Sequence, residues 1–149
     1  MSQQDIVAAA QDLVRSGRSF VLATADENGV PQMRWMGAAH LEEPLTVYMV
    51  AGAQSRKMAQ IAARAESQLM FQNQDYSRVA TLTGTAELVQ DAATKRRVWE
   101  GVASAADYFS GPDDPGFGVI RFRCRRVEML GLGVWEGHGS DCLVCPRDL

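Results

Sequence analysis

The sequence contains few of the residues that build disulfides, metal centres or acid–base sites. Its 149 residues include 3 cysteines and 2 histidines. Three cysteines cannot all pair within one chain, and a reducing compartment keeps most of them as thiols, so disulfides do not build this fold. The chain also lacks the Gly-x-Ser-x-Gly motif that exposes a nucleophilic serine. Hydrolysis by such a serine therefore has no support.

Positive charge and long apolar runs are scarce as well. Lys and Arg number 15 against 18 Asp and Glu, a net charge of -3, and neither sign collects into a run. Phosphate contacts dominate nucleic-acid affinity and require a basic excess, so nucleic acid is a poor candidate partner. The start of the chain is polar, and no apolar run approaches the roughly 20 residues of a membrane span. We expect a cytoplasmic protein that does not bind membranes.

Isolated polar residues give only weak signals for chemistry. Cys142 and Cys145, with His138 and Asp141 nearby, would supply metal ligands, but a structural zinc site usually draws on a second ligand pair. We therefore predict no metal site and interpret the pair as incidental. His40 has no adjacent nucleophile and is interpreted as structural or solvent-facing. The paired carboxylates Glu42-Glu43 and Asp113-Asp114 fall in expected turns, where solvation explains them.

What the chain does have is the composition of a soluble globular protein, with 46% hydrophobic and 22% charged residues. Its length fits one domain over residues 1–149, in which 131–149 form a Gly-rich tail. Apolar spacing predicts helices and strands between turn signals such as Asn28-Gly29. The expected helices are Gln4–Ser16, Ser55–Ala65 and Asp91–Ser104, and the expected strands are Ser19–Ala25, Val30–His40, Leu45–Ala51, Gln68–Gln72, Val79–Val89 and Gly118–Leu130.

The order of these elements indicates the fold class. Strands follow one another with a few helices between them, without the regular alternation of a doubly wound parallel sheet. This pattern favours an α+β protein, mainly an antiparallel Greek-key β-barrel with flanking helices.

The most informative segment is Ser55-Arg56-Lys57, which lies between an expected strand and an expected helix. A helix N-terminus has free N–H groups and a positive dipole end, so a hydroxyl and two cations there make an anion site suited to phosphate. The alternative is an ordinary cap followed by two solvated charges. Because cations oppose the dipole at this end, their placement hints at an anion that neutralises them.

Arg34 lies within an expected strand between apolar residues. Alternation places Arg34 and Met36 on one face and Met33 and Trp35 on the other. An edge-strand arginine is one interpretation. If instead Arg34 faces the same pocket as Lys57, two cations converge on one anion, as phosphate recognition often requires.

These segments together resemble the pyridoxamine-phosphate-oxidase-like FMN-binding split barrels, in particular the general stress protein branch. The resemblance runs from about Phe20 to Glu128. It rests on the order and spacing of several short motifs. They are the stretches 23–31 (ATADENGVP), 33–36 (MRWM), 55–57 (SRK), 84–88 (GTAEL) and 111–115 (GPDDP).

The resemblance implies FMN as cofactor and a homodimer with FMN at its interface. Arg34, Arg56 and Lys57 would hold the FMN phosphate, with Ser55 as a hydroxyl donor. The strand backbones beside the flavin ring would be those of Trp35, Met36 and Gly37 and of Met49, Val50 and Ala51. Trp135 corresponds to a C-terminal aromatic that approaches the flavin in the family.

The chain also departs from the oxidases of this family. The basic C-terminal segment that binds the substrate phosphate in pyridoxine-phosphate oxidases is missing, which argues against oxidation of vitamin B6. The sequence then leaves four hypotheses. They are an FMN-dependent oxidoreductase with unknown catalytic residues, a non-enzymatic flavin-binding stress protein that buffers or senses FMN, the same barrel with a deazaflavin or haem, and a metal-binding tail that uses Cys142 and Cys145.

Overall fold

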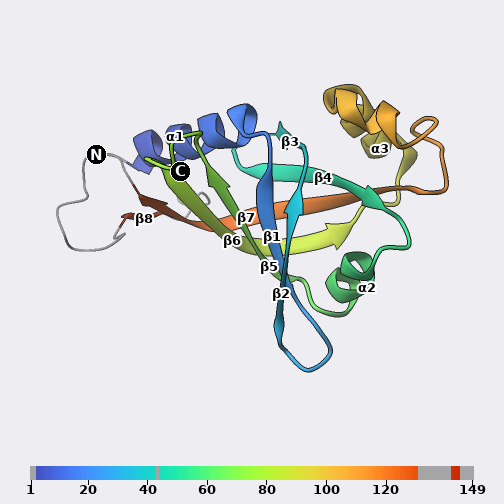
Figure 1. The fold of residues 1–149 in the computed structure, drawn as a ribbon, viewed down its shortest axis with the longest axis horizontal. Coiled ribbons are helices and arrows are strands. Elements are labelled where there is room, and N and C mark those ends of the chain that lie inside the picture. The colour runs from blue at the N-terminus through green and yellow to red at the C-terminus, as the bar shows by residue number, and fades with distance from the viewer. Residues whose placement is uncertain (1–2, 43, 131–141, 145–149) are drawn as a thin grey trace.

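The computed structural model describes residues 3–42, 44–130 and 142–144. Helices and strands follow one another with short connections (Figure 1). In chain order they are α1 (Gln3–Ser16), β1 (Phe20–Ala25), β2 (Pro31–Met36), β3 (Ala39–Glu42), β4 (Thr46–Gly52), α2 (Arg56–Ala63), β5 (Glu66–Gln72), β6 (Val79–Leu88), α3 (Ala92–Gly101), the 3-10 helix η1 (Ala103–Asp107), β7 (Phe117–Leu130) and β8 (Cys142–Val144).

The strands form one antiparallel sheet that curls into a split barrel. Its order is β2-β1-β5-β6-β7-β4-β3, and β8 adds to β7. In Figure 1, α1 lies over one half of the sheet, and α2 and α3 lie toward the other end. The α+β split-barrel prediction is therefore confirmed. None of the helices in the described ranges is long and apolar enough to cross a membrane.

One expected strand is in fact two. The predicted strand Val30–His40 breaks at Gly37 and Ala38, so β2 pairs with β1 while β3 pairs with β4 at the other end of the sheet. Local propensity favours an extended chain on both sides of the break, and only the closure of the barrel decides that the chain changes partner there. The short strand β8 was also not expected.

The barrel interior is the main core. The predicted alternation along β6 is confirmed, because Ala80, Leu82 and Ala86 are buried and the threonines between them are less so. Phe20 and Phe71, both buried in this core, stack with ring centroids 4.4 Å apart. The apolar faces of α1 and α2 complete it.

A second, smaller core lies on the outer face of β4 and β7. Tyr48 and Val119 point away from the barrel interior and pack with Val98 of α3 and with Ala105 of η1. Both faces of β4 are consequently covered, which explains why its sequence is mostly apolar. The helix expected to reach Ser104 ends at Gly101, and η1 continues the chain over this second core.

Candidate functional site

The predicted anion-binding residues lie together between β2 and the start of α2. Arg34 reaches from β2 toward α2, where its Nη2 donates to Oε1 of Gln60 at 3.1 Å. Its Nη1 donates to Oγ1 of Thr24 at 2.8 Å and to the backbone oxygen of Leu22 at 3.3 Å. These partners are neutral, so they orient the guanidinium without cancelling its charge.

Arg34, Arg56 and Lys57 form a cluster of like positive charges, called the cation cluster below. Burial, and then the charge of Arg56, lower the pKa of Arg34. Burial, and then the charge of Arg34, lower the pKa of Lys57. In the part of the chain that the structure describes, none of these three cations forms an ion pair with a carboxylate. Like charges held this close repel each other, and an anion between them would relieve that repulsion.

Ser55 adds a hydroxyl to the cluster. It occupies the N-cap position of α2, yet its side chain makes no capping hydrogen bond. Its Oγ is buried and has no hydrogen-bond partner. A buried polar atom without a partner costs free energy, so this hydroxyl at the helix N-terminus has hydrogen-bonding capacity that no described residue uses.

A cavity of about 310 Å³ lies beside the segment that precedes this cluster. One wall comes from the barrel: the turn after β2 and the end of β4. The other wall comes from the chain after α3. The barrel wall consists of Gly37, Ala38, Val50, Ala51 and Gly52, and the other of Val102, Ser104, Ala105, Tyr108 and Phe109.

The turn after β4 connects the cavity to the cation cluster. The backbone N–H of Ser55 donates to the oxygen of Gly52 at 3.0 Å, so only two residues separate the cavity wall from the first residue of the predicted anion site. A Cβ built on Gly37 or on Gly52 would meet no atom within 4 Å. Both glycines therefore border open space.

The structure does not bring every predicted residue to this place. The side chain of Trp35 is 64% exposed on the sheet face opposite Arg34, as alternation predicted, and Met36 and Met49 point into the main core. None of these three residues lines the cavity. Trp135 lies outside the described residues.

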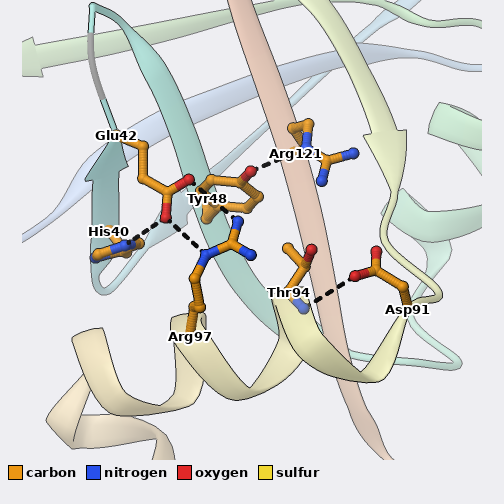
Figure 2. Close-up of polar contacts among 7 residues, drawn as sticks. All are labelled: His40, Glu42, Tyr48, Asp91, Thr94, Arg97 and Arg121. Carbon is orange, nitrogen blue, oxygen red and sulfur yellow. Dashed lines mark hydrogen bonds and ion pairs between the residues drawn. The ribbon is translucent and has the colours of Figure 1, made fainter.

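The sequence did not reveal the contacts that hold the wall formed by the chain after α3, called the outer wall below (Figure 2). Glu42 was interpreted as a solvated turn residue. In the structure it ends β3 and accepts hydrogen bonds from both Nε and Nη2 of Arg97 on α3, each at 3.2 Å. His40 lies 3.2 Å from the same carboxylate and directly beneath Gly101. His40 and Glu42, two residues apart on one strand, were the available signal in the sequence. Arg97, which pairs with Glu42, could not be identified in the same way because it is 55 residues away.

Replacing Glu42 with glutamine should lower the free energy of unfolding by about 0.5–1 kcal/mol at pH 7, the upper part of the range for partly exposed ion pairs. The hydrogen bond from Arg97 lowers the pKa of Glu42 in the folded state. This stabilisation is therefore present above the unfolded-state pKa of about 4.3 and lost as the pH falls through the lower folded-state pKa. Urea denaturation at pH 7 and pH 3 tests this.

The matched control for that experiment is Glu100→Gln, which removes an exposed carboxylate from α3, the helix that carries Arg97. It should leave the free energy of unfolding unchanged at both pH values. If Glu42→Gln lowers the free energy of unfolding as much at pH 3 as at pH 7, the effect is not due to the charge of Glu42.

The C-terminal residues considered above as metal ligands lie mostly outside the described part of the chain. Among the described residues, no group of three or more His, Cys, Asp and Glu is placed to hold a metal ion. His138, Asp141 and Cys145 lie outside those residues, and only the backbone of Cys142 is described, in β8.

Comparison with known proteins gives one family. A family model described as pyridoxamine 5'-phosphate oxidase matches residues 6–131. No curated protein sequence matches the chain.

Solved structures show the same fold at low sequence identity. A Clostridium acetobutylicum protein related to general stress protein 26, of the pyridoxinephosphate oxidase family, has a TM-score of 0.78 and 18% identity over 99% of each chain. General stress protein 26 from Bacillus anthracis has a TM-score of 0.71 and 18% identity, over 87% of this chain and 95% of its own. The heme binding protein from Mycobacterium smegmatis has a TM-score of 0.74 and 20% identity, over 99% of this chain and 59% of its own.

Proposed function

Because the chain belongs to the pyridoxamine 5'-phosphate oxidase family, we propose that it binds FMN and acts as a flavin-dependent oxidoreductase. The observation that carries the proposal is the cation cluster at the start of α2. Three positive side chains and a buried hydroxyl without a partner converge there, beside a cavity that would accept an organic ring.

The phosphate of FMN would be held by Arg34, Arg56, Lys57 and Ser55. Its negative charge would relieve the repulsion among the cations and offset the unfavourable position of two of them at a helix N-terminus. The hydroxyl of Ser55 would donate to a phosphate oxygen. Arg34 would act from a fixed position, since Thr24 and Gln60 already hold its guanidinium.

The flavin ring would lie against the barrel wall of the cavity. Gly37, Ala51 and Gly52 are small, so the backbones of the two strand ends are accessible to a planar ring and its polar edge. Bound flavin supplies the electron-transfer chemistry, and the protein supplies binding, orientation and electrostatics. The chain's own contribution is then to anchor the phosphate, to place the ring, and to exclude water from the face that the cavity covers.

We also propose that the protein is a homodimer. Met33 and Trp35 are 75% and 64% exposed on the outer face of β2. The neighbouring strand adds Val21 opposite Trp35, and Met70 lies opposite Val21 on β5. A second copy of the chain would bury this apolar face. The family resemblance implies that this partner would lie beside the flavin.

Two alternatives keep the same barrel. One is a flavin-binding protein without turnover, favoured by the structural similarity to general stress protein 26. The other is haem, favoured by the similarity to a heme binding protein. Four polar groups suited to a phosphate argue for FMN over haem in this chain. Oxidation of a reduced nicotinamide cofactor by the flavin-loaded protein would separate an enzyme from a flavin buffer.

The proposed function predicts that the protein binds FMN more tightly than riboflavin, which has the same ring but no phosphate. The expected difference is about a hundredfold or more, because several charge-assisted hydrogen bonds are lost together. Titration followed by the flavin absorption bands measures both affinities. Haem, added in the same way, is expected to bind weakly. Equal affinities for FMN and riboflavin would contradict the phosphate site, and absence of FMN binding would overturn the proposed function.

A further inference from the structure

The cavity wall opposite the barrel carries a tyrosine that the proposed FMN site does not use. Tyr108 follows η1 and lines the cavity, yet its side chain is 81% exposed. Its ring therefore borders both the cavity and solvent. A ligand entering from solvent on this side would contact Tyr108.

The backbone beneath this ring is firmly held. The N–H groups of Tyr108 and Phe109 both donate to the oxygen of Ala105, at 3.1 and 3.0 Å. Ala105 is 2% exposed, and the ring of Phe109 packs edge-on against Phe117 at 5.4 Å. The phenol ring of Tyr108 is thus presented from a rigid support, which lowers the entropy cost of stacking on it.

Earlier in the chain, an ion pair attaches the helix that precedes this wall to the barrel. Arg97 of α3 binds the carboxylate of Glu42 through two nitrogens (Figure 2). α3 leads directly into η1, so this ion pair fixes the helix from which the outer wall extends. The distance between the two walls is consequently set by tertiary contacts rather than by the wall segment alone.

The chemistry of the cavity limits what it will accept. None of the described residues around it carries a charge, and its only side-chain polar groups are the hydroxyls of Ser104 and Tyr108. A charged molecule would lose its hydration there without gaining a partner, which is costly. A flat, uncharged ring with one hydrogen-bonding group matches the lining.

We propose that Tyr108 and the η1 wall form a second binding site, facing the flavin, for an uncharged planar aromatic molecule. This inference rests on the proposed function, because the barrel wall of the cavity is assigned there to the flavin ring. It adds the chemical class of the substrate and the residue that recognises it. Tyr108 contacts this molecule by stacking, and Ser104 offers a hydrogen bond.

The test uses the FMN-loaded protein and two probes that share one ring system, 2-naphthol and naphthalene-2-sulfonate. Binding of an electron-rich aromatic next to flavin perturbs the flavin absorption bands, which gives a dissociation constant. The wild-type protein should bind the neutral probe and should bind the sulfonate at least about tenfold more weakly, because its charge has no partner.

Variants identify the residue. Tyr108→Ala should weaken binding of 2-naphthol about tenfold, whereas Tyr108→Phe, which keeps the ring, should stay within about twofold of wild type. The matched control is Tyr76→Ala, which removes a tyrosine that is 71% exposed in the β5–β6 turn and does not line this cavity. All three variants should keep the FMN affinity and melting temperature of the wild-type protein, since both tyrosines are exposed.

The outcomes separate the two proposals. If FMN does not bind, the proposed function fails, and this inference fails with it. If FMN binds but Tyr108→Ala binds 2-naphthol as the wild type does, the proposed function stands and the role of Tyr108 is wrong. If the sulfonate binds as tightly as the naphthol, the assignment of an uncharged substrate class is wrong.

Discussion

Replacing Lys57 with alanine should weaken FMN binding by about ten- to a hundredfold and leave riboflavin binding nearly unchanged. A hydrogen bond to a charged group contributes about 1.5–3 kcal/mol, and each 1.4 kcal/mol is a factor of ten in affinity. Lys57 has the further property that burial and Arg34 already lower its pKa. Its charged form is therefore poorly stabilised until a phosphate is bound.

Titrations with FMN and riboflavin under identical conditions measure this effect, and Arg96→Ala is the control. Arg96 is an exposed cation on α3 whose removal changes the net charge equally. It should leave both affinities unchanged. The wild-type preference for FMN should also fall as salt is added, because screening weakens the attraction between the cluster and the phosphate. Equal loss of FMN and riboflavin affinity in Lys57→Ala would falsify the phosphate role of Lys57.

Replacing Gly52 with leucine should weaken FMN and riboflavin alike, by about ten- to a hundredfold. Gly52 ends β4 at the barrel wall of the cavity, and a Cβ there would meet no protein atom within 4 Å. The leucine side chain can therefore enter the space proposed for the flavin ring without displacing the protein. Forcing extra methylene groups into an occupied space typically costs 1–3 kcal/mol. The phosphate is not involved, so the preference for FMN should persist.

The control for this variant is Gly111→Leu. Gly111 also borders open space, but it lies outside this cavity. Both variants should melt within about 2 °C of the wild type, and only Gly52→Leu should lose flavin. If Gly52→Leu binds both flavins with wild-type affinity, the ring does not lie at the end of β4.

The two variants divide the site into a part that reads the phosphate and a part that accepts the ring. The turn between Gly52 and Ser55 joins these parts. A change in this turn should therefore affect both, whereas changes at Lys57 or at Gly52 separate them. Comparing how much each variant loses in FMN affinity and in riboflavin affinity shows whether the phosphate contact or the ring contact has been broken. Neither affinity shows this by itself.

The residues proposed to bind the phosphate could be singled out from the sequence because they are local or follow a simple period. Ser55, Arg56 and Lys57 are consecutive and directly precede an amphipathic helix, which determines where a phosphate would sit. The face on which Arg34 lies followed from the strand period of two, and the structure places it toward the same helix. Both inferences need only short-range geometry.

The outer wall of the cavity could not be predicted in this way. The segment from Val102 to Phe109 has weak periodicity, and its position depends on Arg97 reaching Glu42 and on aromatic contacts with Phe117. Some of these contacts join residues that are far apart in the chain. Others involve side chains whose orientation no local sequence pattern predicts. Sequence reasoning therefore interpreted Glu42 as a solvated turn residue and did not single out Tyr108.

By itself, the sequence determined the antiparallel α+β architecture, the buried faces of its strands and the residues of the proposed anion site. The periods of strands and helices and the positive end of a helix are properties of adjacent residues. Only the tertiary structure decided that the chain changes partner at Gly37 and that η1 closes the cavity beside the ends of β2 and β4. Those features depend on which distant surfaces bury each other best, and that free energy exists only once the barrel has closed.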